Sequence, residues 1–264
     1  MLKITDLYKT FNPGTVNEKQ VLKGVDLELK DKDFVTVIGG NGAGKSTILN
    51  MIAGVHYPDK GSIVLEDEDI TYIPEYKRAK YLGRVFQDPM MGTASNMAIE
   101  ENLALAYRRG DRRGFAWGIT KEEKEIYVDK LKELDLGLED RLTTKVGLLS
   151  GGQRQALTLL MAALRKPKLL LLDEHTAALD PKTAEKVLKL SEQIISDNAL
   201  TALMVTHNMK NAIQYGNRLI MMYDGRIIYD VSGEEKRNLK VNDLLEKFQS
   251  VSGGEFANDR MMLS

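Results

Sequence analysis

The residue types best suited to chemistry begin in a glycine-rich run, in which Gly39 and Gly42 are followed by Gly44, Lys45 and Ser46. Glycines let a backbone turn tightly and point its N–H groups at an anion, and a helix start turns its positive dipole end toward the same anion. A lysine here reaches the β- and γ-phosphates of a nucleotide, and the serine hydroxyl ligates Mg²⁺. The spacing therefore predicts a phosphate-binding loop. The alternative, an empty glycine turn, leaves Lys45 and Ser46 without a role.

Further polar groups follow short apolar runs. Asp173 and Glu174 come directly after four leucines, and His207 follows the run 202–206. Carboxylates at the carboxyl end of a parallel strand lie where a doubly wound sheet places its chemistry. Ser150 precedes two glycines at the start of an expected helix. The N-terminus of that helix is a second place in the chain that could receive an anion.

Strands and helices must hold these residues in place. The apolar, β-branched run 34–38 predicts a buried strand, and the spacing over 47–53 predicts a helix that ends at Gly54. Alternation and turn signals predict further strands at 2–7, 25–29, 61–65, 169–172 and 202–206 and a hairpin at 219–229. Helices are expected at 98–109, at 120–136 behind a capping box, at 149–164 and at 241–248. Pro89 is expected to end the strand that contains Val85.

Composition limits the classes of function. The chain has 264 residues, no cysteine and a net charge of −1. It can bury a full core, but it can form neither disulfides nor thiolate metal sites, and its charge provides no long-range field for nucleic acid. The first residues lack the apolar region of a signal peptide, and no apolar run approaches the ~18 residues of a membrane span. We therefore expect a cytosolic protein without a nucleic-acid partner.

Taken together, the motifs resemble those of the ATP-binding subunits of ABC transporters, over about residues 2–233. The matching segments are 39–46 (Walker A), Gln87 (Q-loop), 149–153 (signature motif), Leu169–Asp173 with Glu174 (Walker B), 178–180 (D-loop) and His207 (switch histidine). The resemblance implies an α/β fold, namely a P-loop NTPase core with a mostly parallel sheet, an N-terminal antiparallel β subdomain and an inserted helical lobe at about 90–165. It further implies an ATPase domain over 1–233, with a short helix and tail over 234–264.

The resemblance also implies ATP hydrolysis with Mg²⁺. Glu174 would act as general base for the attacking water or would position it, His207 and Lys45 would contact the γ-phosphate, and Gln87 would touch the metal and the water. The residues that would hold ATP are Phe11, Gly39, Gly40, Asn41, Gly42, Ala43, Gly44, Lys45, Ser46 and Thr47, together with Ser150, Gly151, Gly152, Gln153 and Asp180 across a subunit interface. The residues that would hold Mg²⁺ are Ser46, Gln87 and Asp173.

The partners implied are a second copy of the chain, with ATP at the interface of a homodimer, and separate membrane permease subunits. An extracytoplasmic solute-binding protein would complete an importer, and the chain would sit on the cytoplasmic face of the membrane. The run 173–180 is similar to a bacterial subgroup linked to amino-acid uptake, which gives a slight preference for amino acids as cargo. The alternative is a soluble ABC ATPase in DNA repair or translation, but the long coiled-coil insert or tandem nucleotide domain typical of that class is missing.

Some residues keep more than one interpretation. His175 stands where the family usually has a small residue or proline, and it could tune the neighbouring carboxylate, bind a metal or simply begin a turn. The arginines of 108–113 could face anionic lipid or a partner, or lie in a solvated loop. Tyr8 and Phe11 could stack on a purine or fill the core, although the resemblance favours Phe11 as the adenine-stacking residue. The acidic run 66–69 is expected to be a solvated turn.

Overall fold

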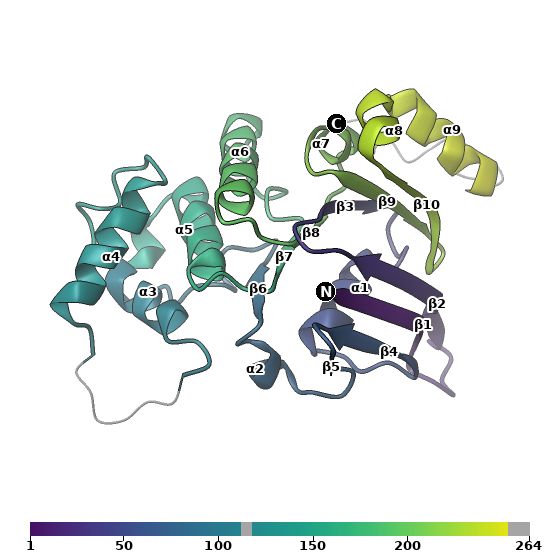
Figure 1. Cartoon of the computed structure of the whole chain (residues 1–264), viewed down its shortest axis with the longest axis horizontal. Helices are drawn as coiled ribbons and strands as arrows, with labels where there is room; N and C mark the ends of the chain where they lie inside the picture. The colour runs from purple at the N-terminus through teal and green to yellow at the C-terminus, as the bar shows by residue number, and fades with distance from the viewer. Residues whose placement is uncertain (112–117, 253–264) are drawn as a thin grey trace. The chain divides into compact units, whose positions relative to one another are not determined.

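The computed structural model describes residues 1–111 and 118–252, apart from the side chain of Ser252. It contains two compact units, Met1–Arg78 with Thr201–Ser264 and Ala79–Leu200 (Figure 1). The two arginines Arg112 and Arg113 of the predicted basic turn and the predicted tail after Gly253 lie outside the described residues.

The first unit begins with an antiparallel sheet, as predicted. Its strands are β1 (Leu2–Phe11), β2 (Lys19–Leu29), β4 (Lys60–Leu65) and β5 (Glu68–Asp69), in the order β2-β1-β4-β5. Residues on one face of β1, such as Leu2, Ile4 and Leu7, are almost fully buried. The alternation that predicted the strands is therefore the alternation between core and solvent.

The same unit contains a largely parallel set of strands. β3 (Phe34–Gly39) pairs in parallel with both β8 (Ala202–Val205) and β9 (Arg218–Tyr223), and β10 (Arg226–Ser232) closes the predicted hairpin onto β9. All six residues of β3 are buried, which explains why its sequence is a continuous apolar run.

Helices complete the first unit: α1 (Lys45–Ala53), α2 (Glu75–Arg78), α7 (Met209–Gln214), α8 (Gly233–Asn238) and α9 (Val241–Ser252). The C-terminal helix α9 packs through Leu244 and Phe248 onto a core that includes Ile38 and Met221. The predicted amphipathic helix is thus anchored to the sheet that carries the phosphate loop.

The second unit combines two parallel strands with a group of helices. β6 (Leu82–Val85) pairs with β7 (Leu169–Asp173) in parallel. The helices are α3 (Ile99–Tyr107), α4 (Lys121–Lys132), a short 3₁₀ helix at Val146–Leu148, α5 (Gly151–Ala163) and α6 (Pro181–Asp197). α3, α4 and α5 pack against one another (Figure 1). The capping box predicted for α4 is confirmed, because Thr120 Oγ1 accepts from the Glu123 amide and the Glu123 carboxylate accepts from the Thr120 amide.

Two elements end earlier than expected. The strand β6 ends at Val85 and not at Pro89, because the Asp88 carboxylate and carbonyl accept from the amides of Met90 and Met91 and start a turn. Helix α4 ends at Lys132 and not near residue 136, because Asp135 adopts a left-handed conformation (φ 51°). A right-handed helix cannot continue through such a residue.

Among the described helices, none has both the length and the apolar character needed to cross a membrane.

Candidate functional site

The glycine-rich run 39–46, the predicted phosphate loop, joins β3 to α1 at the carboxyl end of β3. Gly39 ends the strand with φ 155°, and a Cβ there would collide with the Met222 carbonyl of the neighbouring strand β9. Gly44 (φ 103°) then caps α1 at its N-terminus. Asn41, Gly42 and Ser46 are exposed, so the loop and the first turn of α1 are open to a ligand.

Lys45 is buried, with 5% of its surface exposed, and its side chain folds back onto its own loop. Its ammonium donates to the carbonyls of Gly39 at 2.7 Å and Gly40 at 3.1 Å. The turn of the β9–β10 hairpin supports the loop from the side, since the Gly225 amide donates to the Ala43 carbonyl. The loop is therefore largely preformed around the cation that would meet a phosphate.

A lysine that the sequence did not single out lies near this loop, and it is the strand partner of Phe11. Phe11 pairs with Lys19 across β1 and β2, and Lys19 Nζ lies 3.3 Å from the place a Cβ on Gly42 would occupy. The Phe11 ring meets the His56 ring edge-on, with centroids 5.2 Å apart. The structure thus places Lys19 beside the phosphate loop, while the ring of Phe11, the residue expected to stack on adenine, packs on His56.

Tyr8 has a different environment. Lys60 Nζ lies 5.3 Å from its ring centroid, and its hydroxyl lies against Gly24. Its surroundings therefore favour the interpretation as a packed aromatic of the antiparallel sheet.

His207 follows β8, the parallel neighbour of β3. Because Val37 of β3 pairs with Val205 of β8, the two strands end at the same edge of the sheet. The Thr206 amide donates to the Val37 carbonyl at 3.1 Å, and Asn208 caps α7. His207 is half-buried between these fixed residues and shares an edge with the phosphate loop.

In the second unit, Gln87, Asp173 and Glu174 also meet at one strand edge. β6 and β7 are parallel, and Val85 pairs with Leu172 just before these residues. Gln87 is exposed, while Asp173 and Glu174 are half-buried. An Arg84 nitrogen lies 3.6 Å from Asp173 Oδ2, and its guanidinium stacks on Phe86 with 4.5 Å to the ring centroid. Amide and carboxylate oxygens of this kind are hard ligands that Mg²⁺ prefers.

The Ser150–Gln153 run forms the start of α5. Ser150 Oγ accepts from the Gln153 amide and the Gln153 side chain accepts from the Ser150 amide, each at 3.2 Å. A Cβ on Gly152 would collide with Thr183 of α6, so only glycine allows this close approach of α5 and α6. Asp180 caps α6 by accepting from the Thr183 amide at 3.1 Å, and hydrogen bonding to the side chain and then the backbone of Thr183 holds the pKa of its carboxyl below the ordinary value.

His175 is buried, with 2% of its surface exposed, and its Nε2 lies 2.9 Å from Ser191 Oγ of α6. Burial lowers the pKa of the imidazole to about 4, so the ring is neutral at pH 7. Among the described residues, no three His, Cys, Asp or Glu side chains are grouped to hold a metal ion, so the metal interpretation of His175 lacks partner ligands.

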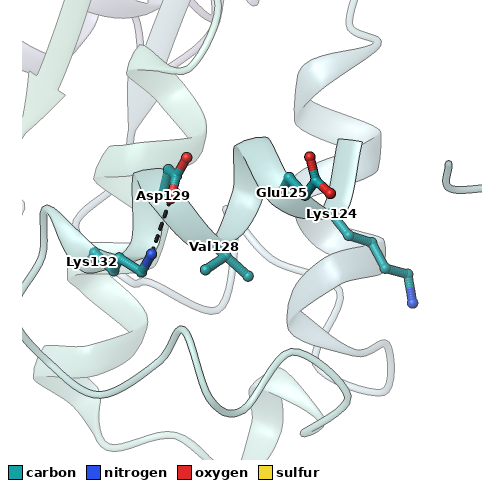
Figure 2. A pocket seen from close by; sticks show the side chains of 5 residues that line it. All are labelled: Lys124, Glu125, Val128, Asp129 and Lys132. Atoms are coloured by element: carbon teal, nitrogen blue, oxygen red, sulfur yellow. Dashed lines mark hydrogen bonds and ion pairs between the residues drawn. The ribbon is translucent and has the colours of Figure 1, made fainter. Parts of the chain in front are cut away.

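A solvent-facing hollow runs along α4 and is lined by Lys124, Glu125, Val128, Asp129 and Lys132 (Figure 2). Lys132 reaches back to Asp129 at 3.1 Å. None of the residues that the sequence singled out for nucleotide chemistry lines this hollow, and its ion pairs are typical of an exposed helix face.

Comparison with known proteins identifies the family of the chain. A family model described as ABC transporter matches residues 22–177. The chain is 44% identical over 249 residues to the tyrosine transport ATP-binding protein of Clostridioides difficile strain R20291, covering 94% of this chain and 99% of that one. It is 33% identical over 240 residues to the methionine import ATP-binding protein MetN of Streptococcus pneumoniae, covering 88% of this chain and 65% of MetN.

Solved structures agree. The dimeric post-hydrolysis state of the ATP-binding cassette MJ0796 bound to ADP and Pi matches with a TM-score of 0.74 and 30% identity, over 88% of this chain and 98% of that one. The ADP conformation of the cassette MJ1267 matches with a TM-score of 0.76 and 27% identity, over 94% and 98%. The alternative of a DNA-repair or translation ATPase is therefore set aside, and the chain belongs to the ABC transporter family as an ATP-binding, ATP-hydrolysing subunit.

Proposed function

We propose that this subunit drives the import of an amino acid, with an aromatic amino acid as the leading candidate. The observation that carries this proposal is the 44% identity, over nearly the whole of both chains, to a tyrosine transport ATP-binding protein. The similarity to a methionine import ATP-binding protein supports amino-acid import more generally.

The nucleotide chemistry is assigned as follows. The backbone of 39–44 and the ammonium of Lys45 receive the β- and γ-phosphates, and Lys45 must exchange its loop carbonyls for phosphate oxygens. Mg²⁺ would be held by Ser46, Asp173 and Gln87, and it would offset phosphate charge. Phosphoryl transfer needs positioning and charge neutralisation, so Glu174 orients and deprotonates the attacking water while His207 stabilises the γ-phosphate.

A second copy completes each site. Ser150 and Gly151 are exposed at the positive end of α5, where the serine hydroxyl hydrogen and backbone amides can meet a phosphate on a partner chain. Asp180 and Gln153 belong to the same surface, because Gly152 packs against Thr183 beside the Asp180 cap. A homodimer built this way contains two identical ATP sites across a two-fold interface.

The permease is proposed to dock on a groove in the second unit. This groove of about 370 Å³ is lined partly by Met91, Leu105, Ala106 and Met161. Met91 and Leu105 are 70% and 51% exposed, and exposed apolar side chains gathered in one groove are typical of a protein-interaction site. Arg84 lines the same groove and lies beside Asp173, so the groove connects to the proposed metal-binding carboxylate.

Two experiments test the proposal. Glu174→Gln should abolish ATP turnover and make the protein elute as a dimer on gel filtration in MgATP, because the site can close but cannot activate water. Glu192→Gln, which alters an exposed carboxylate on α6, is the matched control and should behave as the wild type. A Glu174→Gln protein that turns over ATP normally and stays monomeric would contradict the assignment.

The substrate is tested on the transporter complex purified from membranes through a tag on this chain and reconstituted in liposomes. We expect ATP-dependent uptake of radiolabelled tyrosine that the Glu174→Gln complex lacks. Uptake of methionine in preference to tyrosine would refute the aromatic assignment and keep amino-acid import, whereas uptake of neither would refute both.

A further inference from the structure

The histidine after the catalytic carboxylate has an unusual set of contacts. Glu174 adopts a left-handed conformation (φ 46°), which is unfavourable for a residue with a side chain. Its carbonyl accepts from the Ala177 amide at 2.9 Å, so Glu174 opens the turn that leads to Asp180. Such a backbone persists only where the surrounding structure holds it in place.

The His175 side chain provides a contact of that kind. Its Nε2 lies 2.9 Å from Ser191 Oγ, and both residues are nearly fully buried, with 2% and 1% exposed. Ser191 Oγ donates its hydrogen to the Val187 carbonyl at 2.8 Å. The serine oxygen must therefore accept from His175, which places the proton of the neutral ring on Nε2.

The bond ties together parts of the chain that are 16 residues apart. Ser191 lies on the buried face of α6 with Val187 and Ile194, well inside the helix. The far end of the same turn is fixed to α6 as well, since Asp180 caps its N-terminus. The turn from Glu174 to Asp180 is thus held against α6 at both ends.

We propose that His175 is a positioning residue for ATP hydrolysis, and that its hydrogen bond to Ser191 fixes the backbone that aims the Glu174 carboxylate at the attacking water. This inference rests on the proposed role of Glu174. His175 itself touches neither nucleotide nor water in this scheme. Displacement of a catalytic group by about 1 Å costs on the order of 10²-fold in rate, so a loosened turn lowers turnover while the phosphate loop still binds ATP.

The test compares His175→Gln with His175→Asn. A glutamine amide nitrogen can take the place of Nε2 and donate to Ser191, whereas the shorter asparagine cannot reach it. We expect His175→Asn and His175→Ala to lower kcat about 10- to 100-fold, with KM for ATP within about twofold of wild type. His175→Gln should recover most of kcat. Ser191→Ala should resemble His175→Ala, and the double variant should be no slower than either single one.

The matched control is Ser196→Ala, which removes an exposed hydroxyl from the same helix and should leave kcat unchanged. If His175→Ala fails to fold, the Gln and Asn variants and Ser191→Ala decide the matter through the same kcat and KM measurements. Folded variants with lower melting temperatures but wild-type kcat would overturn the inference, as would equal kcat for the Gln and Asn variants. An active Glu174→Gln protein would instead refute the proposed function, so the two failures are distinguishable.

Discussion

Arg78 offers the sharpest test of how the phosphate-loop helix is held. Its guanidinium is fully buried and donates to the carbonyls of Met51 and Ile52 at 2.7 and 2.9 Å, at the C-terminal end of α1. It also donates to the carbonyls of Ile73 at 2.6 Å and Thr71 at 3.0 Å. A cation at a helix C-terminus satisfies the last carbonyls and opposes the negative end of the dipole.

These contacts allow an estimate of how much Arg78→Met should lower the free energy of unfolding. Hydrogen bonds to charged groups contribute about 1.5–3 kcal/mol each, so four of them give about 6–12 kcal/mol. Dehydration of the guanidinium opposes this by several kcal/mol, and the same burial lowers the pKa of Arg78. Since methionine leaves four buried carbonyls without that donor, we expect a net loss of about 3–5 kcal/mol in the free energy of unfolding.

Urea unfolding and thermal melting followed by circular dichroism measure this loss. For a chain of this size it corresponds to a fall of roughly 10 °C in melting temperature. Lys77→Met is the matched control, because Lys77 is exposed on the same short helix α2 and its replacement should change stability by less than about 0.5 kcal/mol. If Arg78→Met has the same melting temperature as Lys77→Met, the argument that Arg78 caps α1 is wrong.

Two further predictions use the same measurements. Gly54→Ala should destabilise by about 1–3 kcal/mol, because Gly54 has φ 85° and a Cβ would lie 2.8 Å from Arg78 Nε; wild-type stability would refute the packing described. Wild-type protein should lose about 3 kcal/mol relative to His175→Gln as pH falls from 6.5 to 4. The pKa of His175 is lowered to about 4 by burial, so only the unfolded chain gains the proton in that range; parallel pH profiles of the two proteins would contradict this.

The sequence was sufficient for features set by neighbouring residues. The strand, glycine-rich loop and helix of 34–53, the capping box at Thr120 and the β9–β10 hairpin are patterns of a few consecutive residues, and the structure confirms that they form. The family assignment followed from the same short motifs, in their order along the chain, and the comparisons confirm it. A local pattern can be recognised because its energy depends on residues within one or two turns.

Contacts between distant segments were decided by the tertiary structure. Nothing near Arg78 in sequence indicates that it caps a helix 26 residues earlier, and nothing near His175 indicates Ser191 as its partner. Likewise, the approach of Lys19 to Gly42 depends on how β2 crosses the loop. Which buried donor meets which acceptor is set by packing, because an unpaired polar group in the core is costly and the fold must provide its partner from whichever segment lies nearby.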